Sequence, residues 1–187
     1  MARRGDRLPS PATVPVARLS AVVKARLELE RHLRVCANGP LGPQFRFTVT
    51  HARVLIQMLS ELDSPLSAAL RARAAGVVGA LRLERAVPLL RRIALDEKDD
   101  IQTRLNAVTS LILLHPRGIA RDVAKFLEST DAHLRATVYV AAVRSDDARL
   151  RKLAEERYAK EKDRTVLRHV ALRAPWLQSV SQTRDDS

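Results

Sequence analysis

The chain is poor in aromatic residues, glycine and cysteine. Aromatic residues make up 3 % of its 187 positions, and it has six glycines and a single cysteine, Cys36. One cysteine cannot form an internal disulfide, which favours a reducing compartment. No 18 consecutive apolar residues occur, so no membrane-spanning helix is expected, and the first residues lack the apolar segment of a secretory signal. These absences together predict a cytoplasmic protein.

Hydrophobic residues nevertheless make up 46 % of the chain, and a core of Ala, Leu and Val suits helices that pack closely on helices. No segment alternates apolar and polar residues for long enough to form a strand, so we predict an all-α fold. Apolar periodicity, breakers and caps predict helices over residues 16–35, 48–62, 64–82, 84–95, 100–114, 119–127, 131–144, 147–160 and 164–174. We expect residues 1–14 to be a flexible basic arm, residues 15–175 to form the helical domain and residues 176–187 to be a tail.

Four stretches repeat one unit, in which Leu or Thr precedes an arginine and a small residue follows three positions later. They are Leu70-Arg71-x-x-Ala74, Thr103-Arg104-x-x-Ala107, Leu134-Arg135-x-x-Val138 and Leu167-Arg168-x-x-Ala171. The arginines stand 33, 31 and 33 residues apart, and such a period is typical of stacked helical repeats. Asp100 and Asp131 are placed to cap a helix four residues before an arginine, whereas Ser64 replaces the acid in the first unit.

This pattern resembles the HEAT-like repeats, in particular the short variety first noted in phycobilisome lyases. The best matches are residues 86–90, with a proline in the first helix of a pair, and residues 100–107, with Asp-x-x-x-Arg-x-x-Ala in the second. The resemblance implies that the helical domain is a right-handed α-solenoid of antiparallel helix pairs, with about four repeats and an N-terminal capping helix. The sequence departs from the family in three ways: the third and fourth units have no counterpart of Pro88, Thr103 replaces an apolar residue, and the first unit lacks the aspartate.

No catalytic motif occurs in the sequence. There is no glycine-rich phosphate loop and no Gly-x-Ser-x-Gly turn. The five histidines are scattered, so solvation or capping explains them better than metal ligation. Nothing near Cys36 indicates an activated thiolate. We therefore expect no catalytic residue, no metal site and no cofactor.

Charge is unevenly distributed along the chain, which carries +12 overall. The predicted second helices of the pairs contain nine arginines and no Asp, Glu or Lys. In HEAT-like solenoids these helices line the concave face, so the resemblance implies a basic groove. A concave surface that carries charge of one sign attracts a partner of the opposite charge. The guanidinium group of arginine can donate two parallel hydrogen bonds to a carboxylate or phosphate group.

The nine arginines divide into two groups. Those at the repeat position are interpreted as a structural ladder whose side chains brace neighbouring turns: Arg71, Arg104, Arg135 and Arg168. The others are the candidates for partner binding: Arg73, Arg82, Arg144, Arg164 and Arg173. A groove that binds nothing is the alternative to this second assignment.

The leading functional hypothesis is a non-enzymatic scaffold that binds an acidic protein segment in the basic groove, because binding is the usual role of solenoids. The alternative is nucleic-acid binding by the same groove together with the basic arm that contains Arg3, Arg4 and Arg7. Tyr139 is the only aromatic residue in the four second helices that would line the groove. Because stacking on single-stranded bases needs aromatic side chains, the nucleic acid expected there is a duplex that is bound through its backbone.

A third class of function is enzymatic. Some HEAT-like proteins excise alkylated bases from DNA, and others assist bilin attachment. No residue of this chain can be matched to a functional residue of either activity. The segment 173–177 around Trp176 is expected either to fold back on the last helix or to dock on a partner. The sequence leaves the oligomeric state open.

Overall fold

The computed structural model describes residues 20–35, 45–61 and 65–177, and every regular element in these ranges is helical. The α-helices are α1 (Ala21–Val35), α2 (Val49–Ser60), α3 (Pro65–Ala80), α4 (Val87–Leu95), α5 (Ile101–Leu114), α6 (Ile119–Leu127), α7 (Ala132–Val143), α8 (Ala148–Tyr158) and α9 (Arg164–Arg173). The predicted all-α fold is therefore confirmed for the described residues. The predicted arm, 1–14, and residues 178–187 of the predicted tail lie outside them.

Several helices begin at an aspartate whose carboxylate accepts hydrogen bonds from free backbone N–H groups. Asp100 accepts from the N–H of Thr103 at 2.8 Å at the start of α5. The other aspartate caps are Asp131, Asp147 and Asp163. Among the helices that the structure describes, none has the length and apolar content that a membrane crossing requires.

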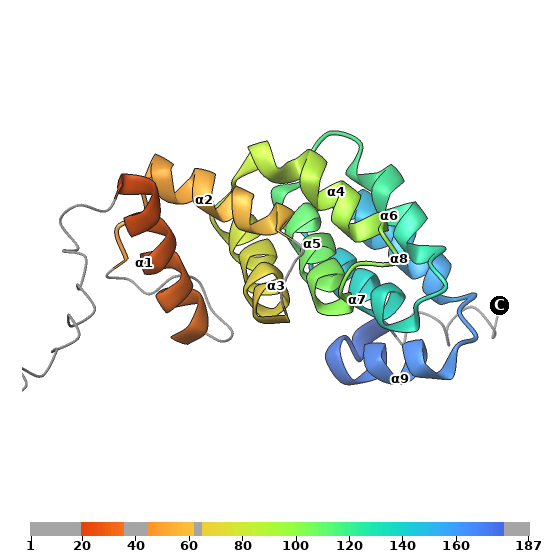
Figure 1. The fold of residues 1–187 in the computed structure, drawn as a ribbon. Coiled ribbons are helices and arrows are strands. Elements are labelled where there is room, and N and C mark those ends of the chain that lie inside the picture. Colours follow the sequence, from red (N-terminus) through yellow and green to blue (C-terminus); the bar gives the residue numbers. More distant parts are fainter. Residues whose placement is uncertain (1–19, 36–44, 62–64, 178–187) are drawn as a thin grey trace, which may run out of the picture.

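The helices are arranged in two rows along the molecule (Figure 1). One row, which we call the odd row, consists of α3, α5, α7 and α9, and each of its members packs against the next. The other, the even row, consists of α4, α6 and α8. α1 lies at one end of the molecule and α9 at the other (Figure 1). Helices that occupy the same place in the sequence repeat are therefore neighbours in space.

One continuous core of Ala, Leu, Val and Ile side chains joins the two rows. Within the odd row, α3 and α5 approach closely: the hydroxyl of Ser110 donates to the carbonyl of Ala75 at 2.6 Å. A Cβ atom on Gly79 would lie 2.7 Å from the Cα of Ser110. Close packing at this contact therefore requires glycine.

α1 and α2 close the end of the molecule opposite α9 (Figure 1). Arg26 of α1 donates to both carboxylate oxygens of Glu61 at 2.6 Å. These hydrogen bonds lower the pKa of Glu61. Val22, Val23 and Leu27 of α1 are exposed, so the exposed surface of the helix that was predicted to cap the array is not wholly polar.

Candidate functional site

The first arginine of the predicted ladder is buried and joins three helices. Arg71 of α3 is 6 % exposed. Its Nε donates to the carbonyl of Leu59 in α2 at 2.5 Å, and its guanidinium binds both carboxylate oxygens of Asp99, with Nη2 to Oδ2 at 2.7 Å. Asp99 precedes α5, and its side chain is 4 % exposed. Arg71 therefore ties α2 and α3 to the start of the next repeat unit.

The second ladder arginine makes a looser contact. Arg104 of α5 is buried, and its guanidinium lies 3.6 Å from the carboxylate of Asp131, which caps α7. Its Nε is buried and has no hydrogen-bond partner in the described part of the chain. Because a buried donor without a partner is costly, we expect this contact to stabilise the fold less than that of Arg71.

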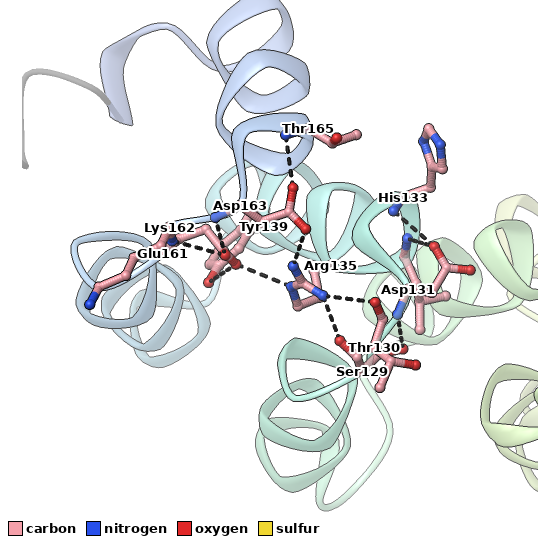
Figure 2. A network of polar contacts seen from close by, with 11 residues as sticks. Ser129, Thr130, Asp131, His133, Arg135, Tyr139, Glu161, Lys162, Asp163 and Thr165 are labelled. Atoms are coloured by element: carbon pink, nitrogen blue, oxygen red, sulfur yellow. Dashed lines mark hydrogen bonds and ion pairs between the residues drawn. The ribbon is translucent and has the colours of Figure 1, made fainter.

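The third ladder arginine, Arg135 of α7, is the centre of the network in Figure 2. It donates to the carbonyl of Ser129 at 2.7 Å and to the carboxylates of Glu161 at 3.2 Å and Asp163 at 2.9 Å. Burial opposes the charge of Arg135, but the two carboxylates outweigh it and raise its pKa. The pKa of Asp163 is lowered by the hydrogen bond from the N–H of Thr165 and also by Arg135. The start of α9 is thereby bound to α7.

These contacts link one repeat unit to the next. Arg71 pairs with an acid 28 residues later, and Arg135 also pairs with an acid 28 residues later. From the sequence, the ladder arginines were expected to brace neighbouring turns. Among the described ion pairs, however, Arg104 contacts Asp131 of the next unit rather than Asp100 of its own. Arg135 also donates to the carbonyls of Ser129 and Thr130 in the turn before its own helix, so the same arginine contacts a neighbouring turn and the next unit.

The fourth ladder arginine has a different environment. Arg168 of α9 is exposed, and it forms no ion pair with any described residue. No further unit with an acidic start comes after α9 within the described ranges. The position that is buried and paired in α3 is therefore open to solvent in α9.

The five arginines that were predicted to bind a partner have no carboxylate partner among the described residues. They are Arg73, Arg82, Arg144, Arg164 and Arg173. Arg73 is half-buried and donates to the carbonyl of Leu33, which ties it to α1. Arg144 is exposed and donates to the carbonyl of Arg173 at 2.6 Å. The side chains of the other three are exposed and have no polar partner in the described residues.

Among the described residues, two of the surface hollows lie along the odd row. The larger, which we call the end hollow, has a volume of about 580 Å³ and lies at the C-terminal ends of α3, α5 and α7. Arg82 and Arg144 line it together with the apolar side chains of Ile112 and Leu113. The smaller, which we call the middle hollow, has a volume of about 220 Å³ and lies between α5, α7 and α9. The end hollow thus combines two of the predicted binding arginines with an apolar surface.

The end hollow also contains acidic groups, and one of them is already paired. Nε2 of His115 lies 2.6 Å from Oδ2 of Asp147, which caps α8. The hydrogen bond with His115 is the main reason that the pKa of Asp147 is lowered. Apart from this pair, the hollow has the two positive charges of Arg82 and Arg144 and the negative charge of Asp146. With His115 neutral, the charges of Arg82 and Arg144 are therefore balanced by those of Asp146 and Asp147, and the hollow has no net charge.

The predicted groove is not uniformly basic. The exposed side of α5 carries Gln102 and Thr109, and the only arginine of that helix is buried. Between α7 and α9, the rings of His133 and His169 lie 5.0 Å apart beside the middle hollow. Their spacing in the sequence gives no sign of this contact, which arises only because the two helices pack together. Among the described residues, no group of three or more metal-binding side chains occurs.

No protein-family model and no curated protein sequence matches the chain. The resemblance to HEAT-like repeats therefore rests on the repeated Asp and Arg positions of the sequence. It stays a prediction, together with the handedness and pairing of helices that it implies.

Proposed function

We propose that the chain is a non-enzymatic, cytoplasmic interaction module, a right-handed α-solenoid of HEAT-like helix pairs that binds an acidic segment of another protein along its odd row. One observation carries this proposal. The ladder arginines of α3, α5 and α7 pair with acids of the fold, whereas the other six arginines in or just after the helices of the odd row, Arg168 and the five candidates for binding, have no carboxylate partner in the described residues. Positive charges that the fold leaves uncompensated attract an acidic partner.

The end hollow is the best candidate for the first contact. Arg82 and Arg144 are both exposed there and can donate charge-assisted hydrogen bonds to carboxylates. Leu113, which is 54 % exposed, offers an apolar surface beside them. An acidic segment that also carries an apolar residue would use both features, since buried apolar anchors supply much of the affinity of such interfaces.

The experiment compares two double charge reversals in fluorescence anisotropy titrations of a fluorescein-labelled peptide made of Glu-Glu-Leu repeats. The test variant is Arg82→Glu with Arg144→Glu. The control is Arg121→Glu with Arg151→Glu, two exposed arginines of the even row, which changes the net charge equally. Arg73 is left intact because it is half-buried and its hydrogen bond ties α3 to α1, whereas Arg144 is exposed and its replacement removes only the hydrogen bond to the carbonyl of Arg173.

We expect the test variant to weaken binding at least about tenfold, since each hydrogen bond to a charged group contributes about 1.5–3 kcal/mol. The control pair should change the affinity less than about twofold, because exposed charges far from the contact are screened by salt. If both variants weakened binding equally, the net charge alone would explain the affinity, and the proposal would be wrong. Thermal unfolding of each variant verifies that it is folded.

The alternative function, nucleic-acid binding, is favoured by the net charge of +12. Tyr139 is 2 % exposed and therefore cannot stack on a base, so a duplex backbone is the ligand to test. Titrations with duplex DNA and duplex RNA at ~50 mM salt address it. Binding that is tighter than that of the acidic peptide, with a steep salt dependence, would favour the alternative, and no binding would remove it.

A further inference from the structure

The middle hollow between α5, α7 and α9 combines apolar and polar side chains. Its apolar residues are Leu105, Ala136 and Val140, and the last two are only 4 % and 9 % exposed. Its volume of about 220 Å³ lies below that of pockets for drug-sized ligands, which begin at about 300 Å³. The hollow therefore suits one small chemical group. The polar residues that line it are half-buried or exposed: Gln102, His133, Thr137, His169 and Arg173.

The charge of the middle hollow has one sign. No Asp or Glu is among the residues that line it, and Arg173 gives it a permanent positive charge. Two other hollows of the described residues differ in this respect. The end hollow contains Asp146 and Asp147, and a hollow between α1, α2 and α3 contains Glu30 and Glu61. Because a concave surface with charge of one sign attracts the opposite charge, the middle hollow favours an anion.

Asp100 and Asp131 precede the two helices, α5 and α7, whose first turns reach the hollow, but both carboxylates are engaged elsewhere. Asp100 accepts hydrogen bonds from the N–H and the hydroxyl of Thr103 at 2.8 and 2.9 Å. Asp131 accepts from the N–H of His133 at 2.9 Å, and its other oxygen lies 3.6 Å from Arg104. Figure 2 shows that the ring of His133 points away from this carboxylate. The two aspartates therefore cap helices and do not pair with the polar groups of the hollow.

Four side chains of the hollow have hydrogen-bond donors that the described part of the fold does not use. The rings of His133 and His169 contact each other with centroids 5.0 Å apart and planes inclined by 63°, and neither ring forms a hydrogen bond or ion pair in the described residues. The same holds for the side chains of Thr137 and Arg173. The carbonyl of Arg173 accepts a hydrogen bond from Arg144 at 2.6 Å, which holds the end of α9 against α7. Imidazole, hydroxyl and guanidinium groups can all donate to an anion placed between these helices.

We propose that the middle hollow binds a phosphate monoester dianion, with Arg173, His133 and His169 as its main hydrogen-bond donors. Such a group has three acceptor oxygens and a charge of about −1.5 to −2 near neutral pH, which suits several donors and no acid. A metal cation does not suit the hollow, because Arg173 would repel it and the two histidines are its only metal-binding side chains. No residue lines both this hollow and the end hollow, so the inference goes beyond the proposed function and does not depend on it.

The five histidines of the full-length protein provide the readout by NMR. The ring Cε1–H signals of His133 and His169 are assigned from their absence in the His133→Gln and His169→Gln proteins. Sodium phosphate is then titrated at neutral pH and constant ionic strength. We expect saturable shifts of these two signals with a Kd below about 10 mM, whereas His32, His51 and His115 serve as internal controls. Shifts that do not saturate, or that are equal for all five histidines, would overturn the proposal.

Matched variants of α9 separate the hollow from the net charge. Arg173→Gln removes the permanent charge of the hollow and should weaken phosphate binding at least about tenfold. The control, Arg168→Gln, removes an exposed charge of the same helix that does not line the hollow, and it should change the affinity less than about twofold. His133→Gln, observed at the signal of His169, should weaken binding at least about threefold. Equal affinities of the two arginine variants, each verified as folded by thermal unfolding, would contradict the proposal.

A series of ligands, titrated in the same way, tests the charge of the bound group and its source. Dimethyl phosphate, a diester with one negative charge, should bind at least about tenfold more weakly than phosphate. Equal binding would mean that the hollow accepts a nucleic-acid backbone, and the proposal would fail. A capped Ala-Ala-phosphoserine-Ala-Ala peptide should bind at least about tenfold more tightly than its glutamate counterpart, and equal affinities would also overturn the proposal. Two results support it and identify the source: a phosphoserine peptide that binds more tightly than inorganic phosphate indicates a phosphorylated protein segment, and one that binds more weakly indicates a free phosphate compound.

Discussion

Arg71 and Arg168 hold the same place in the repeating sequence unit but have opposite environments. Arg71 is 6 % exposed and binds a carboxylate that is itself buried, whereas Arg168 is exposed and forms no ion pair in the described residues. The difference arises from the next unit of the chain. The unit after α3 begins with Asp99 and Asp100, and no such unit comes after α9 within the described ranges. The role of the repeated arginine is therefore decided by its neighbour and not by its own helix.

The largest expected effect is the loss of the buried pair. Arg71→Ala should lower the free energy of unfolding by about 3–5 kcal/mol, because it leaves the carboxylate of Asp99 buried without its counter-charge. Arg168→Ala should change it by less than about 0.5 kcal/mol, as is usual at exposed sites. Urea unfolding at neutral pH measures both. If both variants lost a similar free energy of unfolding, the proposed difference between Arg71 and Arg168 would be contradicted.

A smaller effect is expected where α3 and α5 approach. Gly79→Ala should destabilise the protein by about 1–3 kcal/mol, because its Cβ would meet the backbone of Ser110. Gly76 lies in the same helix, and there a Cβ would meet nothing nearer than 3.9 Å, at Asn106. Gly76→Ala should therefore be neutral or stabilise by up to about 1 kcal/mol through helix propensity. The two Tm values should move in opposite directions or differ clearly, and equal shifts would show that the helices do not approach so closely.

The smallest effect concerns the half-exposed contact between α7 and α9. The pKa of Asp163 in the folded protein lies below its ordinary value of 3.8, through the N–H of Thr165 and through Arg135. A carboxylate with a lowered pKa stabilises the fold above its unfolded pKa, and this stabilisation is lost as the pH falls through the folded pKa. Asp163→Asn retains a capping side chain but not the charge. Its stability deficit should thus be present at about pH 7 and vanish towards about pH 2. Urea unfolding across this range would contradict this expectation if the deficit stayed constant.

The positions of the helices were predictable because caps and breakers act locally. The predicted helix over 100–114 corresponds to α5, which spans Ile101–Leu114 and begins after the Asp100 cap. The predicted start at residue 84 is a 3₁₀ turn, Glu84–Ala86, and α4 itself begins beside Pro88, which suits a first helical turn.

The partners of the arginines could not be predicted, because they depend on how the units are stacked. Asp100 and Asp131 are both plausible partners of Arg104 in the sequence, and only the packing of α5 against α7 selects the second. The hydrogen bond from Arg73 to Leu33 likewise joins residues 40 positions apart. A charge count along the chain therefore identified helices rich in arginine, but it could not separate the arginines that the fold uses from those that it leaves exposed.

The repeated arginine couples one unit of the molecule to the next, and a double-mutant cycle of Arg71→Ala and Asp99→Ala, measured by urea unfolding, tests this coupling most directly. We expect a coupling free energy of about 1–3 kcal/mol between these two residues. In a parallel cycle of Arg104→Ala and Asp100→Ala, the pair within one unit, we expect a coupling near zero. A coupling near zero for Arg71 and Asp99, or a larger one within the unit, would contradict the role of the arginine as a link between units.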